Sequence, residues 1–321
     1  MRREIDGRLL RYFGIDKMNY YFSKNSQSFC EDIEDSMLNK QMTAIVGQVG
    51  AGKSELFEAA CERQQGIIQV IYVKNLFKEK LNIASVINAI ITGLDPSAPI
   101  RRDLEARTIQ LERMVKEKLI NDEKTVVVVI EEAHRLHPDL FRALKELREM
   151  TYTKKGNLFS IVLIGHGNLE TSVKSRREAY WRCNLIYLNE SNGWMTESER
   201  RNYIKVVFGP AITPDAAKTI ATLCKVPLEI VDFVEKKMIE ARKAGKKVLD
   251  SEVVKPSLKE LKEAYNLSLQ DIAEEVSSTG ARMGKTTVHD ILENPSHKLS
   301  GKVADAINRL KNNKASQEKA A

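Results

Sequence analysis

The stretch that decides the fold is a glycine-rich octapeptide between an apolar run and a helical pattern: Gly47-Gln48-Val49-Gly50-Ala51-Gly52-Lys53-Ser54. Its spacing, GxxxxGK[ST], is typical of a strand that turns sharply into a helix, so that backbone N–H groups converge on one anion. In such a loop Lys53 contacts the β- and γ-phosphates of a nucleotide, and the Ser54 hydroxyl binds Mg²⁺. The octapeptide therefore predicts a nucleotide-phosphate site; the alternative is a glycine-rich turn without a ligand.

Two consecutive carboxylates follow the longest apolar run. Residues 125–130 read TVVVVI, and Glu131 and Glu132 come directly after them. Continuous apolar strands are typical of parallel sheets buried on both faces, and ligands bind at the carboxyl edge of such sheets. We expect Glu131 to orient Mg²⁺ together with Ser54, and Glu132 to polarise the water that attacks the γ-phosphate. Alternatively, the two carboxylates only precede the helix expected from Pro138.

The composition is that of an ordinary globular protein. The chain has 321 residues, 42% of them hydrophobic and 30% charged, and no run approaches the roughly 18 apolar residues of a membrane span. The N-terminus lacks the apolar core of a secretory signal, so we expect a cytoplasmic protein without membrane contact. Four scattered cysteines without a CxxC pair indicate neither a zinc site nor a disulfide framework. The net charge of +7 suits a polyanionic partner.

Strand and helix patterns alternate through the first two thirds of the chain. The expected strands are residues 42–46, 67–73, 125–130, 158–164 and 185–188, with helical spacing between them. Such alternation predicts βαβ units and a doubly wound parallel α/β sheet. We expect an N-terminal segment (1–40) whose helix is capped by Ser26 or Asn25, then a nucleotide-binding core (41–190).

Helical patterns dominate the remainder. We expect a helical subdomain (191–250) that is helical over 196–208 and 214–247, with a long exposed helix over 235–255 running into a linker (251–256). A helix-turn-helix-like domain (257–313) and a frayed tail (314–321) would follow.

The domain at 257–313 resembles a helix-turn-helix of phage-repressor type, with its first helix at 269–273 and its reading helix at 286–292. In such motifs the N-terminal residues of the reading helix meet DNA. The candidate DNA contacts are Lys285, Thr286, Thr287 and His289. The connecting turn is long, and residues 256–321 hold ten Lys and Arg against nine Asp and Glu. A protein-docking module is therefore the alternative.

Basic loops of the core are a second candidate DNA surface. Lys74 and Lys78 follow the second expected strand, and Lys154 and Lys155 precede the fourth. Loops of this kind hold the backbone of double-stranded DNA without sequence preference and in a salt-sensitive way. The alternative is that these lysines are only solvated.

The octapeptide, the acidic strand end, the next strand and the helical subdomain together resemble the AAA+ ATPases over residues 20–245. The resemblance implies a P-loop NTPase fold, in which a parallel sheet is flanked by helices and followed by a helical lid. It implies ATP and Mg²⁺ as cofactors and ATP hydrolysis as the activity. The family usually has Asp at the position of Glu131.

The same resemblance assigns further roles. His166 or Asn168, after the strand at 158–164, matches the polar residue that senses the γ-phosphate, although Asn168 is equally suited to capping a helix. Arg182, with Arg177 second, matches the arginine that reaches the nucleotide of a neighbouring subunit; a solvated basic face is the alternative. Where the family's lid often has a nucleotide-contacting arginine, this chain reads KVPL at 225–228. We do not expect zinc at His134, because the spacing is not HExxH.

Within the AAA+ proteins, the chain resembles transposition target-selection ATPases, the family of the phage Mu B protein and the TnsC-type regulators. This resemblance implies ATP-driven assembly into a homo-oligomer or filament on DNA, recruitment of a transposase or related recombinase, and slow hydrolysis. In the phage Mu protein the helix-turn-helix precedes the ATPase, whereas here it follows. The alternatives are a replication initiator or helicase loader with a site-specific tail domain, and a secretion-type ATPase, a class that normally carries a membrane span.

Overall fold

A computed structural model describes residues 5–19, 21–74, 77–149, 156–279, 283–294 and 297–320, with Lys78 and residues 314–320 described by their backbone alone. Contacts divide the chain into two units. One unit comprises residues 22–199 and 226–228, and the other comprises residues 1–21, 200–225 and 229–321. Within the N-terminal segment predicted at 1–40, residues such as Leu9 and Phe13 pack in the core of the helical lid, whereas residues from 22 onward are grouped with the α/β unit.

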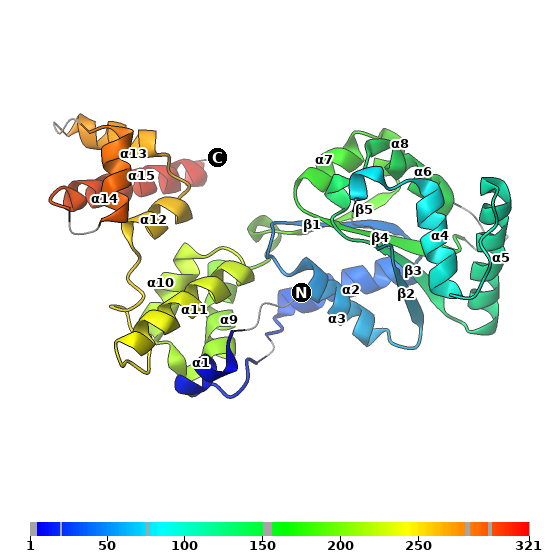
Figure 1. Ribbon diagram of the computed structural model, residues 1–321, viewed down its shortest axis with the longest axis horizontal. Coiled ribbons are helices and arrows are strands. Elements are labelled where there is room, and N and C mark those ends of the chain that lie inside the picture. Colours follow the sequence, from blue (N-terminus) through cyan, green and yellow to red (C-terminus); the bar gives the residue numbers. More distant parts are fainter. Residues whose placement is uncertain are drawn as a thin grey trace. The chain divides into compact units, whose positions relative to one another are not determined.

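The α/β unit is built on a five-stranded parallel sheet (Figure 1). Its strands are β1 (Met42–Gly47), β2 (Ile68–Tyr72), β3 (Thr125–Ile130), β4 (Phe159–Gly165) and β5 (Cys183–Leu188), in the order β2-β3-β4-β1-β5. The five predicted strands are confirmed, and β5 begins two residues before its expected start. Since all strands run in one direction, the ends of β1, β3 and β4 share the carboxyl edge.

Helices cover both faces of the sheet (Figure 1). On one face lie α2 (Lys24–Leu38) and α3 (Lys53–Arg63). On the other lie α4 (Ile83–Leu94), α5 (Leu104–Asn121), α6 (Pro138–Arg148), α7 (Asn168–Lys174) and α8 (Arg177–Tyr180). Short 3₁₀ turns are η1 (Lys78–Lys80), η2 (Ala133–Arg135) and η4 (Glu190–Asn192). The apolar strand residues are buried on both faces, as the continuous run TVVVVI indicates.

The start of α2 differs from the sequence expectation. Its N-cap is Ser23, because the Ser23 hydroxyl accepts from Ser26 N while Ser26 Oγ accepts from Ser23 N, a capping box. The predicted cap at Ser26 or Asn25 is therefore wrong. The amide of Asn25 instead donates to the carbonyl of Gly193, more than 160 residues later in the chain.

In the helical unit, α1 (Gly7–Tyr12), α9 (Glu197–Phe208), α10 (Pro214–Leu223) and α11 (Pro227–Lys243) enclose one core, together with the short η5 (Gly209–Ala211). The helix predicted over 214–247 is broken into two, because Pro227 cannot continue a preceding helix. The predicted long exposed helix over 235–255 is also wrong. The N–H groups of residues 245 and 246 bond back to the last turn of α11, which ends the helix, and Leu249 and Val254 then bury their side chains.

The C-terminal part of the chain folds around a separate cluster of apolar side chains. It comprises α12 (Leu258–Ala264), α13 (Leu269–Ser278), α14 (Lys285–Glu293) and α15 (Ser300–Ala320). The backbone of residues 314–320 continues α15, and the frayed tail at 314–321 stays a prediction. No helix in the described ranges is both long and apolar enough to cross a membrane.

Phe141 in α6 tests the core that supports the sheet, since its ring is fully buried. We expect Phe141→Ala to destabilise the α/β unit by about 3–5 kcal/mol, because the substitution leaves a cavity. Urea unfolding should show the loss as a lower midpoint. The control is Ile109→Ala, an exposed position on α5 where the expected change is within about 0.5 kcal/mol. Equal midpoints for both variants would contradict this assignment of the core.

Candidate nucleotide-binding and hydrolysis site

The predicted octapeptide forms one continuous loop between β1 and α3. Gly50 and Gly52 both have left-handed backbones, with φ of 79° and 86°, which side chains with a Cβ rarely adopt. A Cβ added at Gly50 would also lie 2.5 Å from Cβ of Leu228. The loop turns tightly, with Ala51 N donating to Gln48 O at 3.2 Å. It leads directly into α3, so its backbone N–H groups lie beside the free N–H groups of the first turn of that helix. This arrangement is suited to binding a phosphate.

Lys53 lies across the same loop. Its ammonium donates to the carbonyls of Gly47, at 3.0 Å, and Gln48, at 2.7 Å. Burial lowers the pKa of Lys53, and the carboxylate of Glu132 opposes this shift. An anionic phosphate oxygen is a stronger acceptor than these two neutral carbonyls. The lysine is thus held at the loop by bonds that a phosphate can replace.

Ser54 and Glu131 are in direct contact, although 77 residues separate them. The Ser54 hydroxyl donates to Glu131 Oε1 at 2.9 Å. A hydroxyl and a carboxylate beside a phosphate loop fit Mg²⁺, which prefers hard oxygen ligands and keeps several waters. The two residues predicted to bind the metal therefore lie together, and their metal role stays a prediction.

Glu132 lies one residue further along this edge, with 64% of its side chain exposed. Its Oε2 is 3.7 Å from Nε2 of His134, whose ring stacks on that of His166 with centroids 3.5 Å apart. Burial lowers the pKa of His134, and His166 lowers it further, so the imidazole of His134 is neutral at neutral pH. Sequence reasoning considered His134 only as a zinc ligand and missed its place between Glu132 and His166.

Of the two candidate γ-phosphate sensors, His166 is the one that contacts the acidic end of β3, because its ring stacks on that of His134. Asn168 is exposed and is the first residue of α7, and its backbone N donates to His166 Nδ1 at 3.4 Å. The N-cap of α7 is Gly167, so the alternative of an Asn168 helix cap is wrong. The side chain of Asn168 faces solvent at the same sheet edge as the phosphate loop.

Arg182 and Arg177 are not brought to this chain's own phosphate loop. Cys183, next to Arg182, pairs with Met42 at the start of β1, whereas the loop follows the end of β1. Six strand residues span roughly 20 Å, so Arg182 lies at the opposite edge of the sheet. Its side chain is 62% exposed and lies 3.7 Å from Glu149. Arg177 is the first residue of α8, which ends before Arg182.

The residues that lead into α11 contact the phosphate loop without an arginine. Leu228 N donates weakly to Gly50 O at 3.4 Å, and the Leu228 side chain lies over Gly50. Residues 226–228 are accordingly counted with the α/β unit. Sequence reasoning noted the missing arginine but had no signal for this apolar contact.

The candidate DNA contacts are only partly described. Lys74 is exposed just beyond β2, on the carboxyl edge, and the backbone of Lys78 lies in η1. Lys154 and Lys155 lie outside the described residues. The C-terminal candidates are all exposed on the first turns of α14, where the intervening Val288 is buried: Lys285, Thr286, Thr287 and His289.

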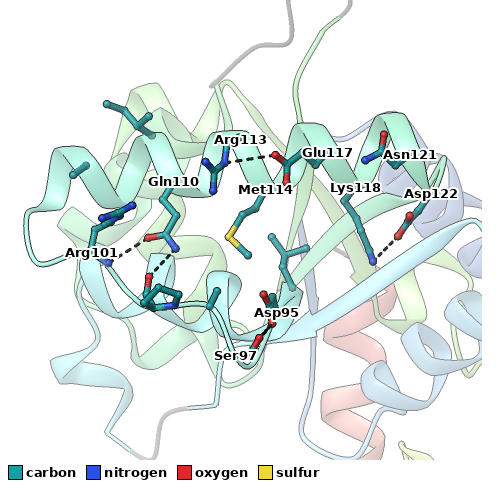
Figure 2. Close-up of a pocket in the computed structure, with 15 residues that line it drawn as sticks. Asp95, Ser97, Arg101, Gln110, Arg113, Met114, Glu117, Lys118, Asn121 and Asp122 are labelled. Atoms are coloured by element: carbon teal, nitrogen blue, oxygen red, sulfur yellow. Dashed lines mark hydrogen bonds and ion pairs between the residues drawn. The ribbon is translucent and has the colours of Figure 1, made fainter.

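A separate cavity of about 610 Å³ runs along α5 and the loop before it (Figure 2). Gln110 spans that loop, accepting from Arg101 N at 3.3 Å and donating to Pro99 O at 2.9 Å. Arg113 and Met114 also line the cavity. None of its lining residues belongs to the phosphate loop or to the strand ends, so this cavity is distinct from the candidate nucleotide site.

Comparison with known proteins agrees with this geometry. A protein-family model described as AAA domain matches residues 36–172. No curated protein matches the chain in sequence. Among solved structures, Cdc6p from Pyrobaculum aerophilum is 14% identical with a TM-score of 0.55, covering 96% of this chain and 90% of that one.

Two further structures share the fold. The ORC2 protein of Aeropyrum pernix, in ADPNP and ADP complexes, is 11% identical with a TM-score of 0.54, covering 94% of this chain and 89% of that one. Drosophila ORC bound to DNA is 13% identical with a TM-score of 0.53, covering 97% of this chain and 86% of that chain. The phosphate loop, the acidic end of β3 and the AAA-domain match over residues 36–172 together show that the chain has the AAA+ P-loop fold and is an ATPase.

Proposed function

We propose that the protein is an ATP-dependent DNA-binding ATPase that assembles as a homo-oligomer or filament on double-stranded DNA. The observation that carries the proposal is the combination, in one chain, of a phosphate-binding loop beside the acidic end of β3 with a helical domain that exposes the first turn of α14. The phosphate site supplies nucleotide binding, and the exposed Lys285, Thr286 and Thr287 are of the types that contact DNA phosphates and base edges.

Hydrolysis follows from the placement of the side chains around the loop. The loop N–H groups and Lys53 would bind the phosphates, and Ser54 and Glu131, whose side chains are in contact, would hold Mg²⁺. When bound, the metal neutralises charge on the β- and γ-phosphate oxygens. Glu132 is the general base that accepts the proton of the attacking water. His166 is the γ-phosphate sensor, in contact with His134, and Asn168 is the second polar candidate at this edge.

Oligomerisation is supported by the position of Arg182. Since it lies at the sheet edge opposite its own phosphate loop, it can stabilise a transferring phosphoryl group only in a neighbouring subunit. The site would then be completed by a second copy of the chain, with Arg177 as the other candidate. ATP hydrolysis would thereby depend on assembly.

The biological role has two candidates. The sequence resemblance favours recruitment of a transposase or related recombinase to DNA, with slow ATP turnover releasing the assembly. The second candidate is a replication initiator or helicase loader with a site-specific C-terminal domain. It is supported by the likeness of fold to Cdc6p and ORC proteins over nearly the whole chain, including the C-terminal helices.

Glu132→Gln should separate nucleotide binding from hydrolysis. We expect ATP affinity to be retained and turnover to fall by about 10²–10⁴-fold, because the general base is lost while Lys53 and the loop are intact. Steady-state phosphate release and nucleotide titration measure the two effects. Lys53→Ala is the control that should lose nucleotide binding itself. Turnover equal to that of the unmodified protein would refute the role of Glu132.

Arg182 is tested by mixing two inactive variants. Lys53→Ala lacks phosphate binding but retains its arginine, and Arg182→Ala binds ATP but lacks the arginine. We expect each alone to be nearly inactive and a mixture to recover part of the ATPase activity, because mixed oligomers contain complete sites. Repeating the mixing experiment with Arg177→Ala in place of Arg182→Ala identifies which arginine acts on the neighbouring subunit's nucleotide. Activity of Arg182→Ala alone at the unmodified level would exclude a role in trans.

DNA binding is tested at α14. We expect Lys285→Ala to weaken binding to double-stranded DNA in the presence of ATP. The slope of log K against log [salt] should become less steep by about one. Lys302→Ala, an exposed lysine on α15, is the matched control. Binding-site selection then separates the two roles, since an initiator returns a defined motif and a target-selection ATPase does not. Absence of any ATP-dependent DNA association would overturn the proposal.

A further inference from the structure

Trp194 occupies an unusual position for a core aromatic residue. The chain has two tryptophans, of which Trp181 is 72% exposed and Trp194 only 5%. Trp194 follows β5 and η4, where its backbone N donates to Asn189 O at 3.0 Å and the preceding Gly193 turns the chain. The turn directs the indole against the back of the phosphate loop, 143 residues away in the sequence.

The indole makes a single hydrogen bond, and its acceptor belongs to the loop. Nε1 of Trp194 donates to the carbonyl of Ala51 at 3.0 Å, in a buried setting. Ala51 itself is almost fully buried, and a Cβ added at Gly52 would lie 3.9 Å from Cζ2 of the indole. The ring thus packs against the Ala51–Gly52 peptide and bonds its carbonyl.

Peptide geometry gives this bond a consequence for the site. The carbonyl of Ala51 and the N–H of Gly52 belong to one planar trans peptide, so the two groups point in opposite directions. A donor that holds the carbonyl from behind therefore fixes the N–H forward, where the loop receives an anion. Without that donor, the peptide between two residues of a glycine-rich loop can rotate and withdraw its N–H.

The indole is itself held in place by α2. Phe29 packs edge to face against it, with ring centroids 5.6 Å apart and an interplanar angle of 88°. The amide of Asn25 donates to the carbonyl of Gly193, immediately before Trp194. These contacts fix the backbone before Trp194 and the indole ring itself. The direction of the indole N–H is therefore determined by residues outside the phosphate loop.

We propose that Trp194 is a positioning residue for phosphate binding: its indole N–H orients the Ala51–Gly52 peptide so that the Gly52 N–H faces the nucleotide phosphate. The residue acts through the loop backbone and touches neither the nucleotide nor the attacking water. Its loss therefore weakens binding of any nucleotide with a β-phosphate and leaves the chemical step almost unchanged.

Trp194→Phe tests the proposal, because it keeps an aromatic ring and removes the donor. We expect the Kd for ADP, measured by calorimetric titration, to rise about 5-fold, the value of one neutral hydrogen bond. The KM for ATP should rise in parallel, with kcat within about 2-fold. Trp181→Phe, which removes the exposed tryptophan, should leave both constants unchanged. An unchanged Kd, or a fall in kcat at constant Kd, overturns the proposal.

A second measurement does not depend on the stability of the Trp194 variant. In Trp181→Phe, Trp194 is the sole tryptophan, and its donor is bonded to the loop that receives the phosphate. We expect saturating ADP to change its fluorescence emission and adenosine, which has no phosphate, to leave it unchanged. No change in Trp194 emission with ADP, or an equal change with adenosine, contradicts the assignment. The two fluorescence measurements, with ADP and with adenosine, require neither DNA binding nor assembly.

Discussion

Backbone N–H groups attract an anion strongly only when they are held in a convergent arrangement, and the structure depends on maintaining that arrangement in the loop at 47–54. The loop cannot hold itself, because two of its residues have left-handed backbones and no side chains. Its two ends are fixed by β1, which lies between β4 and β5, and by α3. Between them, Leu228 lies over Gly50 and Trp194 bonds Ala51. Residues remote in the sequence thus supply the rigidity on which phosphate binding depends.

A second constraint is the direction of the strands. In a parallel sheet all carboxyl ends share one edge, so Ser54, Glu131, Glu132 and His166 meet although they come from three segments of the chain. The same rule places the residue before β5 at the other edge, with Arg182 roughly a strand length from the loop. The parallel direction of the strands therefore brings the candidate hydrolysis residues together and keeps Arg182 away from them, which is the basis for proposing a site shared between subunits.

The electrostatics of the site follow from partial burial. Desolvation lowers the pKa of both Lys53 and His134. The histidine is therefore neutral and stacks on His166 without placing a second full positive charge beside the lysine. The side chain of Glu132, whose carboxylate is 3.7 Å from His134, is 64% exposed. A solvated carboxylate is free to reorient toward water, as a general base requires.

The sequence by itself determined the phosphate loop, the Ser54–Glu131 pair and the five strands, because each is encoded by local spacing or by a continuous apolar run. It also predicted the exposed first turn of α14. Helix ends were less predictable: Ser23 rather than Ser26 caps α2, and α11 ends at Lys243, because several polar residues compete for the same backbone groups. Only the tertiary structure decided the contacts of Trp194, Leu228 and His134, and the edge on which Arg182 lies. These depend on packing between segments up to 178 residues apart, for which a single sequence contains no local pattern.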